Sequence, residues 1–242
     1  MSTKLAEQLR KGTTKSHSMA ENVSFVKSFL GGVVDKKAYR KLVANLYFVY
    51  VAIEKQMESN KNHQLIQPIY FTELHRTTSL KDDLKYYYGD NWIDEIAPSE
   101  ATQIYVRRIH EVGMNQPELL VAHAYTRYMG DLSGGQILKK IAQNAMNLSG
   151  NQGTSFYDFP EIQNESLFKD NYRGQLNQIP VDERQISDII AEANIAFTLN
   201  MKMFQELNSS LIKIMIMLLV NTISNLKINQ RFFPVKKSKS KS

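Results

Sequence analysis

The sequence predicts an all-α fold, a single-domain bundle of many helices, and three observations carry this prediction. Apolar residues recur at spacings of three and four along most of the chain, the period of a helix with one buried face. No alternating run typical of a β-strand extends over more than a few positions. Only 11 glycines and 6 prolines occur in 242 residues, which disfavours the many tight turns of a β-sandwich or barrel.

The first half of the chain predicts four apolar helical stretches. An N-terminal stripe runs from Leu5 to Leu30 and is broken at Gly31-Gly32. The clearest helix is expected over 36–58, where apolar residues follow at spacings of four, three, four and four: Leu42, Leu46, Val49, Ile53 and Met57. Shorter helices are expected near 71–88, ended by Gly89, and near 99–112, with Ser99 as N-cap ahead of Thr102 and Gly113 as the end.

The second half predicts a long helical run followed by two more helices. Pro117 at a first-turn position opens an apolar stretch that continues past several glycines to Leu148. A loop is expected over 149–160. Helices near 162–178 and 181–207 then complete the body.

Charge separates the body of the chain from its C-terminal end. Residues 1–206 carry 23 basic and 24 acidic side chains, whereas residues 207–242 carry 7 basic and no acidic ones, so the net charge of +6 comes from the end. A nucleic-acid-binding protein should show a basic face on its body, and this class is therefore disfavoured.

The C-terminal apolar run Leu211–Val220 has ten residues and contains Lys213, whereas a bilayer-spanning helix needs about 20 apolar residues. A buried terminal helix is expected, with interfacial or partner contact as the alternative. We therefore expect a body over 1–207, a terminal helix over 208–230, a basic disordered tail over 231–242 and no membrane-spanning segment.

The absence of cysteine limits the possible chemistry. Disulfides, cysteine-bound zinc, iron–sulfur clusters and thiolate nucleophiles are all excluded, so redox chemistry would need a non-covalent cofactor and external electrons. No N-terminal apolar segment of a signal peptide is present, and secretion is not expected.

Three glycines within six helical positions, Gly130, Gly134 and Gly135, form the most unusual local feature. They cost about 2 to 3 kcal/mol relative to alanine. A phosphate loop would follow a strand, but a helical pattern precedes these glycines. Two interpretations remain: tight helix packing with a kink, or close approach of the backbone to a flat ligand.

Polar residues near these glycines predict a hydrogen-bond network, and one histidine has a carboxylate at helical spacing. Asp131 lies next to Gly130, with Tyr125, Arg127 and Tyr128 within two turns, a set that suits proton delivery. His17 has Glu21 one turn later, and such a carboxylate can orient an imidazole toward a metal. A lone histidine is nevertheless more often structural than a ligand.

Three segments together resemble haem oxygenase over about residues 3–207. They are His17 with Ala20-Glu21-Asn22, then Asn45-Leu46-Tyr47 with Tyr50-Val51-Ala52, then the run from Ala122 to Gln136. The resemblance implies a bundle in which haem lies between a proximal and a kinked distal helix. It implies that haem b is both substrate and cofactor and is opened by O2 at the α-meso carbon to biliverdin IXα, CO and Fe²⁺.

The resemblance also implies roles for individual residues. His17 would bind the iron, with Glu21 as its partner, while Gly130, Gly134 and Gly135 would lie against the porphyrin. Asp131 would hold the water that supplies protons, and a wider network would support it: Tyr50, Tyr105, Arg127, Tyr128 and Asn200. The propionates would be held by four residues: Arg10, Tyr125, Lys169 and Arg173. Lys11 and Lys15 are alternatives to Arg10. Phe197 would line the haem.

Location and electron supply follow from the same resemblance. The segment after Glu206 differs from the membrane anchor of animal members and is similar to cyanobacterial and algal plastid forms. This similarity implies ferredoxin as the electron donor. It also implies a role in phycobilin synthesis, with a downstream bilin reductase as a further partner. His17 lies too near the start for a transit peptide, so a plastid stroma or a cyanobacterial cytoplasm is expected. The alternatives are a non-catalytic haem carrier or sensor and a thiaminase-like protein, whose chemistry needs a cysteine.

Overall fold

The computed structural model describes the backbone of residues 4–232 and the side chains of residues 4–207. The chain divides into two compact units, residues 1–207 and 208–242. Over the described backbone all regular structure is helical, with no strand, as the periodicity predicts. Within that part of the chain no helix is both long and apolar enough to cross a membrane.

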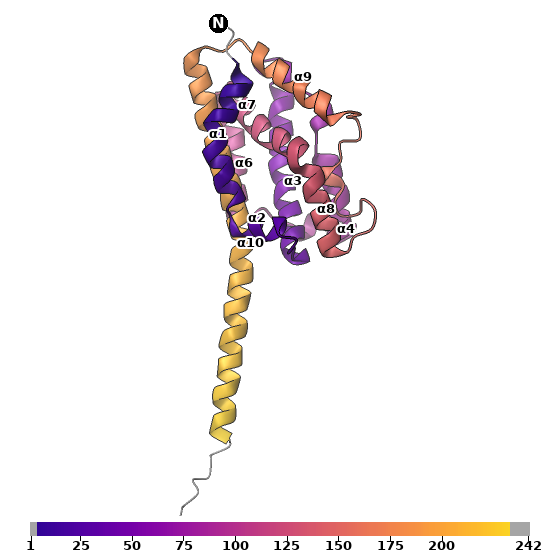
Figure 1. The fold of residues 1–242 in the computed structure, drawn as a ribbon, viewed down its shortest axis with the longest axis vertical. Helices are drawn as coiled ribbons and strands as arrows, with labels where there is room; N and C mark the ends of the chain where they lie inside the picture. The colour runs from indigo at the N-terminus through magenta and orange to yellow at the C-terminus, as the bar shows by residue number, and fades with distance from the viewer. Residues whose placement is uncertain (1–3, 233–242) are drawn as a thin grey trace, which may run out of the picture. The chain divides into compact units, whose positions relative to one another are not determined.

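The N-terminal stripe folds as two helices rather than one. α1 (Leu5–Glu21) and α2 (Ser24–Leu30) are separated at Asn22 and Val23, and α2 ends directly before Gly31-Gly32, where the break was predicted. α1 lies beside the first part of α10 in Figure 1, and the hydroxyl of Ser16 donates to the side-chain oxygen of Asn194 at 2.5 Å. This hydrogen bond joins α1 to α10.

The central helix α3 (Lys36–Ser59) matches the expected 36–58 helix and packs against α4 (Thr77–Tyr88) and α6 (Glu100–Asn115). Gly89 ends α4 with a positive φ of 84°, and the Ser99 side chain caps α6 by accepting from the backbone N–H of Thr102, both as predicted. α4 begins later than expected, because the short turns η1 (Gln67–Ile69) and η2 (Thr72–Leu74) precede it.

The expectation that Gly113 ends α6 is wrong. Gly113 lies inside the helix, and a β-carbon there would fall 2.7 Å from Cδ of Gln56 on α3. The glycine therefore allows α3 and α6 to approach closely instead of providing a helix stop.

The long run opened by Pro117 consists of four consecutive elements. η3 (Pro117–Leu119) leads into α7 (Leu120–Ala124), then a π-helical turn, η4 (Tyr125–Met129), and then α8 (Gly130–Met146). A π-helical turn interrupts the α-helical hydrogen-bond pattern and is a recognised cause of a kink. The interruption falls immediately before Gly130, at the start of the glycine-rich stretch.

The remaining elements close the first unit. The expected loop contains the short turn η5 (Ser155–Tyr157), and α9 (Glu165–Gln178) follows it. A short helix, α5 (Trp92–Glu95), precedes α6. α10 runs over Glu183–Phe232, so its backbone continues through the stretch for which a separate terminal helix was expected. The burial of residues 208–230 and the state of most of the basic tail, residues 233–242, lie outside the described residues.

Candidate functional site

The polar cluster predicted around Asp131 is assembled from four elements. Asp131 stands in the first turn of α8, Arg127 in the π-helical turn, Tyr50 on α3 and Asn200 on α10. The Tyr50 hydroxyl donates to one Asp131 oxygen, and Nη2 of Arg127 donates to the other at 3.3 Å. Arg127 also donates through Nε to Tyr50 at 3.0 Å and through Nη1 to Asn200 at 3.0 Å.

Burial controls the electrostatics of this cluster. The side chains of Asp131 and Arg127 are each 10% exposed. Burial raises the pKa of Asp131, while the positive charge of Arg127 and the hydrogen bond from Tyr50 oppose that rise. Burial also raises the pKa of Tyr50 well above its ordinary value, so Tyr50 is a donor at neutral pH. The arrangement keeps a carboxylate at the edge of the core with two fixed donors.

Two further predicted members of the network, Tyr105 and Tyr128, are buried in the same region. Their hydroxyls have no hydrogen-bond partner among the described residues. The Tyr128 ring lies 6.0 Å from the Tyr50 ring. Buried hydroxyls without a protein partner are commonly satisfied by ordered water.

The three glycines do not share one environment. A β-carbon at Gly130 or Gly134 would meet no atom within 4 Å, so the side of α8 that they define is open. A β-carbon at Gly135 would instead face Tyr157, with Cδ1 of its ring 3.6 Å away. The bare face next to Asp131 therefore consists of Gly130 and Gly134, while the Cβ direction of Gly135 points into the core.

His17 lies on the outer part of α1 with its imidazole accessible. Its side chain is 60% exposed, and Nδ1 stands 3.5 Å from a carboxylate oxygen of Glu21, as the spacing predicts. The Phe197 ring on α10 contacts the imidazole edge at a centroid distance of 5.8 Å. A histidine oriented by a carboxylate on one side keeps its other nitrogen available to a ligand.

Two of the cations expected to hold carboxylates, Arg10 and Arg173, lie near Tyr125. Burial raises the pKa of Tyr125, and the charges of Arg173 and Arg10 lower it, which places both cations near this phenol. Lys169 donates to the backbone oxygen of Leu132 at 3.3 Å and so joins α9 to α8. Lys11, the neighbouring alternative to Arg10, forms an ion pair with Glu7 at 2.7 Å.

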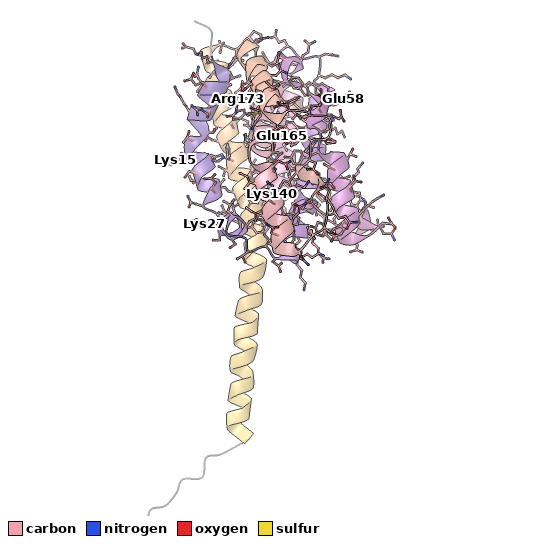
Figure 2. All side chains as sticks on the ribbon, turned by 45° about the vertical axis from the view of Figure 1, so that its right-hand side comes forward. Lys15, Lys27, Glu58, Lys140, Glu165 and Arg173 are labelled. Carbon is pink, nitrogen blue, oxygen red and sulfur yellow. The ribbon has the colours of Figure 1, made fainter. Side chains whose placement is uncertain are left out.

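Positive side chains also line the molecular face formed by α1, α2, α8 and α9. Figure 2 shows Lys15, Lys27, Lys140 and Arg173 on this face, with Glu165 among them. Glu58 lies away from this group, at the other side of the view. We call the four cations the basic rim.

A second buried ionic network was not predicted. Glu192 on α10 is 2% exposed and accepts from Nε2 of His123 at 3.0 Å, while Nε and Nη2 of Arg108 donate to it at 3.0 and 2.6 Å. Burial alone would raise the pKa of Glu192, but these hydrogen bonds outweigh burial and lower the pKa to about 2. No local signal identifies the network, because its members lie on α6, α7 and α10.

Asp83 and Arg76 are two further buried charged residues without a signal in the sequence. Asp83 on α4 is completely buried and accepts from two backbone N–H groups. Arg76 is 2% exposed and donates to several backbone oxygens. Both residues form hydrogen bonds with the backbone of the segment that follows α8.

Comparison with known proteins finds one family throughout. The family model described as "Heme oxygenase" matches residues 3–206. The chain is 70% identical over 223 residues to a heme oxygenase of Pyropia yezoensis, covering 92% of this chain and 94% of that protein. It is 57% identical to heme oxygenase 1 of Synechocystis over 224 residues, covering 93% of each.

Solved structures agree with the sequence comparison. The crystal structure of heme oxygenase-1 from Synechocystis in complex with heme aligns with a TM-score of 0.86 at 56% identity, covering 91% of this chain and 100% of that one. A second Synechocystis structure, heme oxygenase-2 in complex with heme and NO, aligns with a TM-score of 0.84 at 45% identity, covering 86% of each chain.

Proposed function

The chain belongs to the haem oxygenase family, and we propose that residues 1–207 form a catalytic domain that opens haem b at the α-meso carbon to biliverdin IXα, CO and Fe²⁺. Haem is the substrate and, when bound, supplies the iron at which O2 reacts. The observation that carries the proposal is the buried set of Asp131, Tyr50 and Arg127 beside the bare face of Gly130 and Gly134.

The residues present fit a flat iron-containing ligand. His17 offers an accessible imidazole held by Glu21, which suits an axial iron ligand. The β-carbon positions of Gly130 and Gly134 are open, so a planar group can approach the backbone of α8. Relatives at 56% and 45% identity have been solved with heme bound. We assign His17 to the iron, Phe197 to the wall beside it, and Gly130 and Gly134 to the opposite face.

Arg10 and Arg173 near Tyr125, together with Lys169 on α9, would fix the orientation of haem. Arg10, Lys169 and Arg173 supply the positive charge that two propionates need, and Tyr125 supplies a hydroxyl donor. Holding both propionates at one edge would fix which meso edge faces the polar cluster. This orientation would select the α-meso carbon.

Asp131 would hold the water molecule that supplies protons at the bare glycine face. Its two oxygens accept from Tyr50 and Arg127, so the carboxylate cannot turn away, and it can hold a water molecule toward haem. Asn200 fixes Arg127 from α10, and Tyr105 and Tyr128 supply hydroxyls that would extend the water chain. The protein therefore contributes orientation and proton supply, while haem carries the redox chemistry.

Electrons would come from a small acidic protein, and we propose reduced ferredoxin. The basic rim supports this proposal, because a cluster of cations raises the rate of association with an acidic partner (Figure 2). Relatives from red algae and cyanobacteria support a role in phycobilin synthesis, with a bilin reductase downstream, in a plastid stroma or a cyanobacterial cytoplasm.

One turnover experiment separates this proposal from the alternative of a haem carrier or sensor. Purified protein with haemin, O2 and reduced ferredoxin should lose the absorption of intact haem and yield biliverdin IXα, identified by chromatography against the four isomers. His17→Ala should bind haem more weakly and form no biliverdin. Persistence of intact haem in the unmodified protein would favour a carrier, and another isomer would contradict the assigned orientation.

A further inference from the structure

The segment Ser155–Phe159, here called the backing segment, lies between two buried charges. Asp83 accepts from the backbone N–H of Ser155 at 2.7 Å and from that of Phe156 at 2.8 Å, one hydrogen bond to each carboxylate oxygen. Within the described part of the chain, no lysine or arginine forms an ion pair with Asp83. The carboxylate is therefore satisfied by the backing segment itself.

Arg76 holds the same segment from its carbonyl side. Its Nη1 donates to the backbone oxygen of Phe156 at 3.3 Å and also to that of Asp158, and its guanidinium carbon stands 3.7 Å from the centre of the Phe159 ring. The residue Phe156 is thus held at its N–H by Asp83 and at its C=O by Arg76. This double restraint fixes the backbone from which the Phe156 side chain projects.

The backing segment contacts Tyr50, one member of the proposed proton-delivery pair, and α8, the helix that carries the other member, Asp131. The Phe156 ring meets the Tyr50 ring edge-on at 5.5 Å, and Tyr50 donates to Asp131. On the α8 side, the Tyr157 ring packs beside Gly135, and its backbone oxygen accepts from Gln136 at 3.0 Å. One rigid segment therefore supports the helix that carries Tyr50 and the helix that carries Asp131.

We propose that Asp83 is a positioning residue for the reaction: it fixes the backing segment so that Tyr50 and Asp131 stay aligned at the bare glycine face. This inference rests on the proposed function. Asp83 would not touch haem, and its effect would pass through Phe156 and Tyr157. Loss of Asp83 should therefore change which products form from bound haem and should leave the affinity for haem unchanged.

Asp83→Asn tests the proposal, because asparagine keeps the shape but presents an N–H₂ to one of the two backbone donors. Haem affinity should stay within about twofold, while the biliverdin yield should fall about tenfold, as expected for a small misplacement of catalytic groups. Peroxide-driven oxidation of guaiacol by the haem complex should rise. Hydrogen exchange of the haem-free protein should become faster in the backing segment, a readout that does not depend on turnover.

Asp82→Asn is the matched control, since Asp82 is the exposed neighbour of Asp83 on the same helix. It should leave product ratio and hydrogen exchange unchanged. If Asp83→Asn does not fold, Phe156→Leu carries the same test, because it removes the ring that meets Tyr50.

An unchanged ratio of biliverdin to guaiacol oxidation in the variant tested would overturn the inference, and so would loss of haem affinity without a change in that ratio. Failure of the proposed function is distinct, since the unmodified protein would then form no biliverdin.

Discussion

At the scale of single residues, the central group of the proposed site is the buried carboxylate of Asp131. A carboxylate that is 10% exposed and bound to two donors is held in one orientation. Burial raises its pKa, and Arg127 keeps it from rising further. Its neighbours Gly130 and Gly134 carry no side chain, and a β-carbon at either would meet no atom within 4 Å.

Asp131→Ala should therefore separate binding from turnover. Haem affinity is expected to stay within about twofold, because His17 and the cations near Tyr125 are unchanged. Biliverdin formation should fall about 100-fold or more, the contribution typical of a positioned proton-transfer group. Tyr50→Phe should give a smaller loss, since it removes one donor and leaves the carboxylate. A normal biliverdin yield from Asp131→Ala would remove Asp131 from proton delivery.

At the scale of helices, buried charges join elements that are distant in sequence. Glu192 connects α10 to α6 through Arg108 and to α7 through His123. Because α7 leads directly into the π-helical turn and α8, this network supports the start of the glycine-rich stretch. Apolar contacts alone would not set the rotation of α10 so closely, since hydrogen bonds are directional.

Replacing Glu192 tests whether its hydrogen bonds to Arg108 and His123 stabilise the fold. The free energy of unfolding and its dependence on pH are the measured quantities. Glu192→Gln should lower the free energy of unfolding at pH 7 by about 3 to 5 kcal/mol, the cost of removing one partner of a buried ion pair. The pKa of Glu192 is lowered from 4.5 to about 2, so its contribution is complete above pH 4.5 and is lost as pH falls through 2.

The stability of Glu192→Gln should accordingly vary less between pH 5 and 2 than that of the unmodified protein. Glu111→Gln provides the control, because Glu111 pairs with the same Arg108 but is 57% exposed. Its cost should stay below about 1 kcal/mol. Equal costs for the two variants, measured by urea denaturation, would contradict the assigned role.

The bare face of α8 offers a second test at the helix scale. Gly134→Leu should abolish haem binding, because the side chain would occupy the space beside the backbone. The haem-free protein should unfold at an equal or higher temperature, since leucine favours a helix over glycine by roughly 1 kcal/mol and its β-carbon would meet no atom within 4 Å. Gly134→Ala should weaken haem binding less. Unchanged haem titration with Gly134→Leu would exclude this face as the binding surface.

At the scale of the whole molecule, the proposed docking of an acidic electron donor depends on the charges of one face. Residues 1–206 are nearly neutral in total, yet the basic rim gathers four cations on the face formed by α1, α2, α8 and α9 (Figure 2). A group of surface cations acts on encounter rates rather than on folding. It would place an electron donor beside the helices that carry His17 and the bare glycine face.

Turnover driven by reduced ferredoxin should therefore slow as salt is raised from 0.05 to 0.5 M, by about tenfold, because screening shortens the reach of the rim charges. Turnover driven by dithionite should change little. Lys140→Ala should reduce the ferredoxin-driven rate at low salt, whereas Lys61→Ala should not, since Lys61 pairs with Glu58 at 2.6 Å away from the rim. Equal salt dependence with both reductants would contradict docking at the rim.

Much of the fold could be predicted from local patterns. The 36–59 helix has a continuous apolar stripe, Gly89 and Ser99 act at helix ends as their chemistry predicts, and the long segment from Ala122 to Gln136 is specific enough to indicate a family. The resemblance to the family was sufficient to predict Asp131, Tyr50 and His17 as site residues. These features depend on residues close in sequence or on a contiguous motif, so no knowledge of the packing is needed.

The sequence by itself determined an all-helical, cysteine-free chain with a glycine-rich helix and one histidine placed for a metal. Only the tertiary structure showed that Gly113 allows close packing rather than ending a helix, that Gly135 faces Tyr157, and that Asp83 and Glu192 are buried charges with partners at least 69 positions away. The physical reason is that burial and hydrogen-bond partners are properties of contacts between helices, and the spacing along one helix does not contain them.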